Sequence, residues 1–66
     1  MAWVEVEFAD DDSKSMVNTD TINAMRNYED ELGRMRYNIY LNFGIYLTIK
    51  EESYNKIMDV IKKEVI

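Results

Sequence analysis

The sequence predicts a small α+β protein in which an antiparallel β-sheet of four or five strands is covered on one face by a C-terminal helix. Residues 35–50 contain two runs of alternating apolar and polar side chains with a glycine turn between them, which is typical of a β-hairpin. Residues 51–65 repeat their apolar side chains at helical spacing instead. Because the sheet and the helix each bury one apolar side, we expect the two to pack together.

The register of the central hairpin follows from its alternation. Gly44 supplies the positive φ that a tight turn needs. A two-residue turn would pair Leu41 with Tyr46 and would mix the apolar and polar faces. A three-residue turn at residues 42–44 pairs Leu41 with Ile45 and keeps one face apolar. We therefore expect the three-residue turn.

The opposite face of this hairpin gathers polar and aromatic side chains. The predicted cross-strand pairs are Tyr40 with Tyr46, Asn38 with Thr48, and Arg36 with Lys50. Neighbouring rings with nearby donors suit a protein interface or a nucleotide-like ligand. An exposed strand also favours Tyr and Thr without any partner, so a plain solvated face is the alternative. With Trp3 on the first strand and Arg34 at the basic end, the candidate binding residues are Trp3, Arg34, Arg36, Asn38, Tyr40, Tyr46, Thr48 and Lys50.

Two shorter strands are expected nearer the N-terminus. Residues 3–8 alternate cleanly, and residues 14–18 form a second short run that we expect to pair with the first. The aspartates of residues 10–12 lie between the two strands. They lack the alternating oxygen ligands and the glycine of a calcium loop, so we expect a solvated turn and no metal.

Residues 21–32 fit two structures. Ile22 and Met25 lie about one helical turn apart, and a following glycine is able to end a helix. The segment also alternates as a strand does, with Arg26 as the interruption, and its Asn and Thr residues are weak helix formers. We favour a strand over residues 22–28 with an exposed acidic turn after it, and the helix remains the alternative.

The C-terminal segment has the clearest pattern. Its apolar stripe consists of Tyr54, Ile57, Met58, Ile61 and Val65. Glutamates at its start and lysines at its end suit the helix dipole. We expect this stripe to cover the apolar face of the sheet.

Composition bounds the possible functions. The 66 residues make one domain with a net charge of −5, and the first twelve residues hold five acids and no base. An acidic chain argues against a nucleic-acid partner. No leader and no membrane-spanning run of ~20 apolar residues is visible, so we expect a cytoplasmic protein with no membrane partner.

The absence of Cys and His from the sequence excludes a disulfide and a typical zinc site. Without those residues, nucleophilic and general acid–base chemistry is disfavoured, so we expect no enzyme activity, no catalytic residues and no cofactor. A chain this short buries only ~60% of its unfolded surface. Small domains often compensate by self-association, so we expect a homo-oligomer.

Three segments give the chain a family resemblance: VNTDTI at residues 17–22, IYLNFG at residues 39–44, and TIKEESY at residues 48–54. Over about residues 16–61 the sequence resembles the short flagellar regulator FlbD family and similar small phage-borne proteins. The resemblance implies short antiparallel strands before a helix, and a non-catalytic adaptor or regulator. Phe43, the acidic turn at residues 10–12 and the connection at residues 29–33 depart from the family's pattern.

Size, exclusion and resemblance together suggest a function. We expect a phage-encoded inhibitor that sequesters or blocks a component of bacterial anti-phage defence, either a host protein or a small nucleotide signal. The alternatives are a regulatory adaptor that binds a bacterial transcription or flagellar regulator, and a structural subunit of an oligomer. Genes that neighbour this one would separate the first two.

Overall fold

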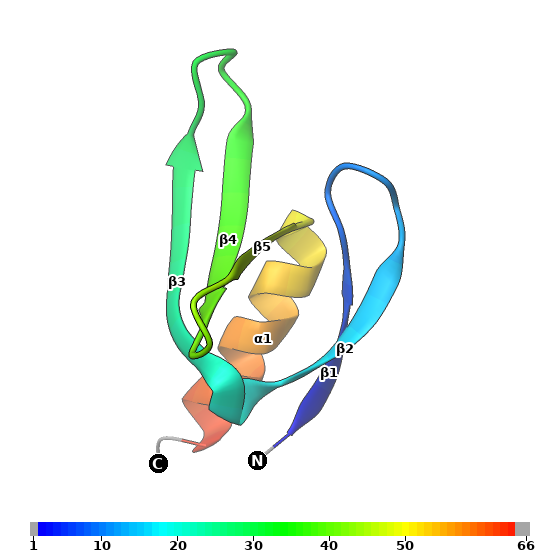
Figure 1. Ribbon diagram of the computed structural model, residues 1–66, viewed down its shortest axis with the longest axis vertical. Helices are drawn as coiled ribbons and strands as arrows, with labels where there is room; N and C mark the ends of the chain where they lie inside the picture. The colour runs from blue at the N-terminus through cyan, green and yellow to red at the C-terminus, as the bar shows by residue number, and fades with distance from the viewer. Residues whose placement is uncertain (1, 65–66) are drawn as a thin grey trace.

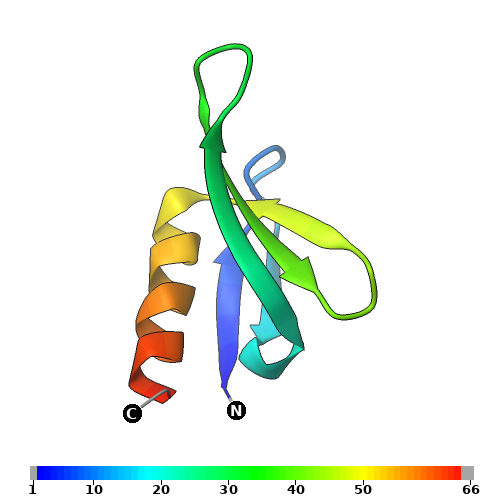
Figure 2. The ribbon, with the colours of Figure 1, turned by 90° about the vertical axis from the view of Figure 1, so that its left-hand side faces the viewer.

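Two antiparallel sheets and one helix make up residues 2–64, the part of the chain that the computed structural model describes (Figures 1 and 2). The elements are β1 (Trp3–Glu7), β2 (Lys14–Asn18), a 3-10 turn (Thr19–Thr21), β3 (Ile22–Glu29), β4 (Met35–Leu41), β5 (Tyr46–Ile49) and α1 (Glu51–Glu64). The predicted α+β class, the five strands and the C-terminal helix are confirmed. The strands divide into a β1-β2 hairpin and a β3-β4-β5 meander.

The two sheets meet where the chain leaves β1 and β5. Phe8 forms an isolated antiparallel bridge with Ile49. Beside it, the backbone N–H of Lys50 donates to the carbonyl oxygen of Glu7 at 3.0 Å. The strands therefore follow one another in space in the order β2-β1-β5-β4-β3, and β5 is the strand of the meander that adjoins β1.

The predicted hairpin register is confirmed. Tyr37 pairs with Ile49, and Tyr40 pairs with Tyr46. The backbone N–H of Leu41 donates to the carbonyl oxygen of Ile45 at 2.8 Å, which closes a three-residue turn. Gly44 adopts a φ of 86° in this turn, where a side chain would be strained.

Residues 22–29 form a strand, which settles the ambiguous segment in favour of the predicted strand. β3 pairs antiparallel with β4, with Met25 opposite Ile39. An irregularity between Ile22 and Ala24 shifts the register. Because a bulge moves the alternation by one residue, Ile22 and Met25 both pack against the core although they are three residues apart. This spacing is what made the segment look partly helical.

The core lies between α1 and the inner sides of both sheets. Its buried apolar residues are Val4, Val6, Val17, Ile39, Leu41, Ile49, Tyr54 and Ile57. The helix packs against β1 and β4, and Figure 2 shows it on the side opposite the β4–β5 turn. Of the predicted stripe, Tyr54 and Ile57 are buried and Met58 and Ile61 are half-buried, whereas Val65 lies outside the described residues.

Candidate functional site

The outer face of the β3-β4-β5 sheet, on the side away from Ile39 and the core, is built from three cross-strand rows. Strand alternation and the observed register place these side chains together. The rows are Ala24–Tyr40–Tyr46, Arg26–Asn38–Thr48 and Tyr28–Arg36. We call this surface the tyrosine face. Five of the eight candidate residues, Arg36, Asn38, Tyr40, Tyr46 and Thr48, lie on it.

The first row carries an aromatic pair. The ring centroids of Tyr40 and Tyr46 lie 5.6 Å apart, and the ring planes are inclined by 36°. Tyr40 is half-buried, whereas Tyr46 is 60% exposed. The pair therefore exposes a large ring surface to a partner, and the ring of Tyr46 is held in place by its contact with Tyr40.

A second aromatic group comes from β3. The guanidinium carbon of Arg26 lies 4.9 Å from the ring centroid of Tyr28, in a cation–π arrangement. Arg26 is exposed and Tyr28 is half-buried. The sequence interpretation missed both residues, because Arg26 was taken as an interruption of the alternation. With the bulge at Ile22 included, alternation from Ala24 onwards would have placed them on this face.

The polar centre of the face is enclosed rather than open. Asn38 is only 2% exposed, although its strand position was expected to face outward to a partner. The hydroxyl of Thr48 donates to the side-chain oxygen of Asn38 at 2.8 Å. The amide nitrogen of Asn38 donates to the Tyr40 hydroxyl at 3.4 Å. Asn38 is thus a buried support beneath the face, which corrects its expected role as an exposed contact.

The rim of the face is neutralised from within the chain. A guanidinium nitrogen of Arg36 lies 3.2 Å from a carboxylate oxygen of Asp10, in the turn between β1 and β2. The solvated turn expected at residues 10–12 is therefore an incomplete description of Asp10, because its carboxylate pairs with Arg36. Arg36 keeps a planar guanidinium at the edge of the site, but its charge is already compensated.

Lys50 does not lie opposite Arg36 as expected, because β5 ends at Ile49 and the chain turns into α1. The Lys50 ammonium instead lies 2.9 Å from a carboxylate oxygen of Glu7, and it also pairs with Asp12. Hydrogen bonds to Asp12 and Glu7 raise the pKa of Lys50 above its ordinary value. This cation stabilises the junction of the two sheets.

The remaining two candidate residues lie elsewhere. Trp3 is exposed on β1. Arg34 lies in the turn between β3 and β4, where its Nε lies 2.9 Å from a carboxylate oxygen of Asp30. The structure therefore does not bring Trp3, Arg34 and Lys50 onto the tyrosine face.

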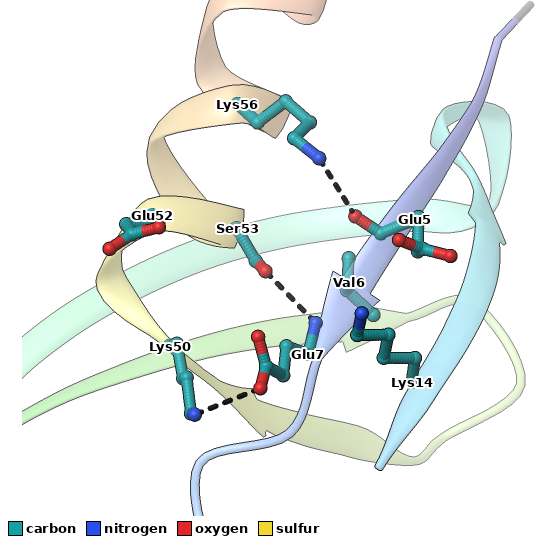
Figure 3. A pocket seen from close by; sticks show the side chains of 8 residues that line it. All are labelled: Glu5, Val6, Glu7, Lys14, Lys50, Glu52, Ser53 and Lys56. Atoms are coloured by element: carbon teal, nitrogen blue, oxygen red, sulfur yellow. Dashed lines mark hydrogen bonds and ion pairs between the residues drawn. The ribbon is translucent and has the colours of Figure 1, made fainter. Parts of the chain in front are cut away.

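A polar hollow of about 210 Å³ lies between β1 and the start of α1 (Figure 3). The Ser53 hydroxyl accepts a hydrogen bond from the backbone N–H of Glu7 at 2.9 Å. The Lys56 ammonium donates to the carbonyl oxygen of Glu5 at 3.5 Å. These bonds and the Lys50–Glu7 pair hold the start of α1 against β1. We therefore interpret the hollow as a structural junction and not as a binding site.

Two general findings bear on function. Within residues 2–64, no group of three or more acidic side chains is arranged to hold a metal ion. No helix in the described part of the chain is long and apolar enough to cross a membrane.

In comparisons with known proteins, no protein-family model, curated protein or solved structure matches this chain. The resemblance to the FlbD family therefore stays a prediction. The function has to be argued from the tyrosine face itself.

Proposed function

We propose that this protein is a small non-enzymatic binding protein that engages a protein partner through the tyrosine face. The observation that carries the proposal is the exposed ring of Tyr46 packed against Tyr40, with Arg26 over Tyr28 on the neighbouring strand. Tyr and Arg are the residue types that dominate binding energy in protein interfaces.

The build of the face supports recognition rather than simple exposure to solvent. The tyrosines and arginines stand on paired strands, so little conformational entropy is lost when a partner orders them. Asn38 and Thr48 fix the centre from below through a 2.8 Å hydrogen bond. Since Asp10 already neutralises Arg36, Arg26 is the arginine of this face that would meet a carboxylate of the partner.

For the biological role, we propose a phage-encoded inhibitor that acts in the cytoplasm of the host by sequestering or blocking a component of anti-phage defence. The support is the small size of the chain and its resemblance to small phage-borne proteins. An adaptor for a bacterial transcription or flagellar regulator would use the same face. A subunit of a structural oligomer would use it for contacts with copies of itself.

The test compares the wild-type chain with a Tyr46→Ala/Arg26→Ala double variant. Both side chains are exposed, so the variant should fold normally, as far-ultraviolet circular dichroism would show. Native mass spectrometry of each protein, purified gently from the cells where it acts, would detect a bound host protein or a small bound mass. We expect a host protein on the wild type and at least a tenfold loss from the double variant.

A Leu32→Ala variant serves as the matched control, because Leu32 is also exposed but lies in the β3–β4 turn. Equal capture by the wild type and the folded double variant would contradict the assignment of the face. A small nucleotide mass in place of a protein would replace the protein-partner proposal with the sequestering of a nucleotide signal.

A further inference from the structure

An apolar hollow of about 410 Å³ is lined mainly by side chains of β1, β2 and the β4–β5 hairpin, rather than by those of α1. Four of its large apolar side chains are between 49% and 65% exposed: Trp3, Met16, Phe43 and Ile45. Core residues Val17 and Leu41 form part of its wall. The hollow is therefore an opening into the core that the helix does not cover.

Beside this hollow lies a strand edge. Within residues 2–64, β2 has one neighbouring strand, β1. The pairing runs from Phe8 N–H to the Ser13 carbonyl and from Thr19 N–H to the Ala2 carbonyl. Odd-numbered residues of β2 thus point their backbone groups toward β1, and alternation directs those of Lys14 and Met16 toward the open edge. Such an edge is a template for an added strand.

We propose that a second copy of this chain docks on this surface by pairing its own β2 with β2 of the first copy, antiparallel about a two-fold axis at Met16. In that register Met16 lies opposite Met16 of the other copy, and Lys14 lies opposite Asn18. A shift that centred the axis on Lys14 would instead place two lysines opposite each other, which costs energy. The register centred on Met16 therefore lets the edge pair with itself without opposing two like charges.

The exposed area fits this occupant. A covered aromatic side chain buries ~150–250 Å², so Trp3 and Phe43 with Met16 and Ile45 give on the order of 500 Å² of coverable surface per copy. Two copies would together reach the roughly 1,000 Å² that a specific interface requires. A patch of this size matches the largest apolar patch of a typical monomer, and such patches are often functional. The side chains that line the hollow are different from those that build the tyrosine face, so one copy can use both surfaces.

The first measurement is the oligomeric state by analytical ultracentrifugation from micromolar to millimolar concentration. It is made at physiological salt, where the Debye length of about 8 Å limits repulsion between two chains of net charge −5. We expect a dimer for the wild type. Met16→Lys would place two charges opposite each other and should weaken the dimer at least tenfold, with circular dichroism unchanged. Leu32→Lys, in the β3–β4 turn, should leave it intact.

A cross-linking experiment tests the register without relying on those variants. The chain contains no Cys, so a single introduced thiol has only its copy as a partner. Opposed residues of a hydrogen-bonded antiparallel pair have Cα atoms ~5.5 Å apart, which suits a disulfide. Met16→Cys should therefore form a covalent dimer under diamide at least ten times faster than Lys14→Cys, whose thiols would lie more than ~10 Å apart.

Three outcomes would overturn the proposal. They are a wild-type monomer at millimolar concentration, a dimer that survives Met16→Lys, and equal cross-linking of the two cysteine variants. A surviving dimer would assign self-association to another surface. A monomer would leave the edge to an extended segment of a different protein.

Discussion

Arg36 and Asp10 are separated by 26 residues in the sequence, and their side chains form an ion pair at 3.2 Å on the rim of the tyrosine face. The pair ties the turn after β1 to the central strand of the meander. Asp10 also occupies the position at Arg36 where a carboxylate of a partner would otherwise bind. A residue that looks like a ligand contact in the sequence is thus occupied by the chain itself.

This pair should contribute little to stability. Asp10 has a side chain that is 73% exposed, and exposed ion pairs are worth only ~0–1 kcal/mol. A double-mutant cycle with Arg36→Ala and Asp10→Asn, measured by urea denaturation, should give a coupling energy below ~1 kcal/mol. A coupling of several kcal/mol would show that the turn is held far more firmly than its exposure implies.

Ser53 should matter more than its size suggests. It is buried, and its hydroxyl accepts the backbone N–H of Glu7 at 2.9 Å. Ser53→Ala would leave that N–H without its acceptor, which should cost about 1–3 kcal/mol of unfolding free energy. Ser15→Ala, on the exposed strand β2, is the control and should change stability by less than ~0.5 kcal/mol. Similar values for the two variants would contradict the proposed fastening of α1.

The buried amide of Asn38 should support the tyrosine face from below. Asn38→Ala removes the acceptor of the Thr48 hydroxyl and should destabilise the fold by about 1–3 kcal/mol. A Thr48→Val change in the Asn38→Ala background removes the stranded hydroxyl as well, so it should recover part of that loss. Chemical denaturation of both variants tests this, and a further loss in the double variant would contradict the bonding described for this pair.

Acid should weaken the turn between β3 and β4. The backbone N–H of Arg34, and then the Arg34 side chain and the Leu32 N–H, hold the pKa of Asp30 below its ordinary value of 3.8. A carboxyl group with a lowered pKa in the folded state stabilises the protein above its unfolded pKa, and that contribution is lost as the pH falls through the folded pKa. Stability should therefore decline below about pH 4.

Asp30→Asn provides the comparison for this pH dependence. The variant should be less stable than the wild type at pH 7, and the two should converge as the pH is lowered below 3.8. Thermal denaturation at a series of pH values measures the difference. A constant gap between the two proteins down to the lowest pH would show that the Asp30 carboxylate is not the group responsible.

Local patterns sufficed for part of the fold. Alternation and one glycine predicted the hairpin register through Tyr40 and Tyr46, because a slip by one residue would expose the apolar face. The strand at β3 was harder, since the irregularity after Ile22 imitates helical spacing. The alternation also placed Lys50 wrongly opposite Arg36, because β5 ends at Ile49 and α1 begins at Glu51.

The candidate site was only partly predictable for a related reason. Alternation identifies which side chains share a face, and it grouped Tyr40, Tyr46 and Thr48 correctly. It does not show which distant segment folds over a given strand, so the meeting of Arg36 with Asp10 could not be foreseen. Nor does it show how far neighbours enclose a side chain, which is why Asn38 was expected at the surface.

The junction of β5 with β1 predicts an order of folding. The meander of residues 22–49 forms through connections that are close in sequence, whereas the bridge between Phe8 and Ile49 closes a loop of about forty residues. Closing such a loop costs chain entropy before the contacts between the two sheets form. We therefore expect the N-terminal hairpin to attach after the meander and α1 have formed. The amide of Lys50, bonded to Glu7 across this junction, would then gain protection from hydrogen exchange later than the amides inside the meander.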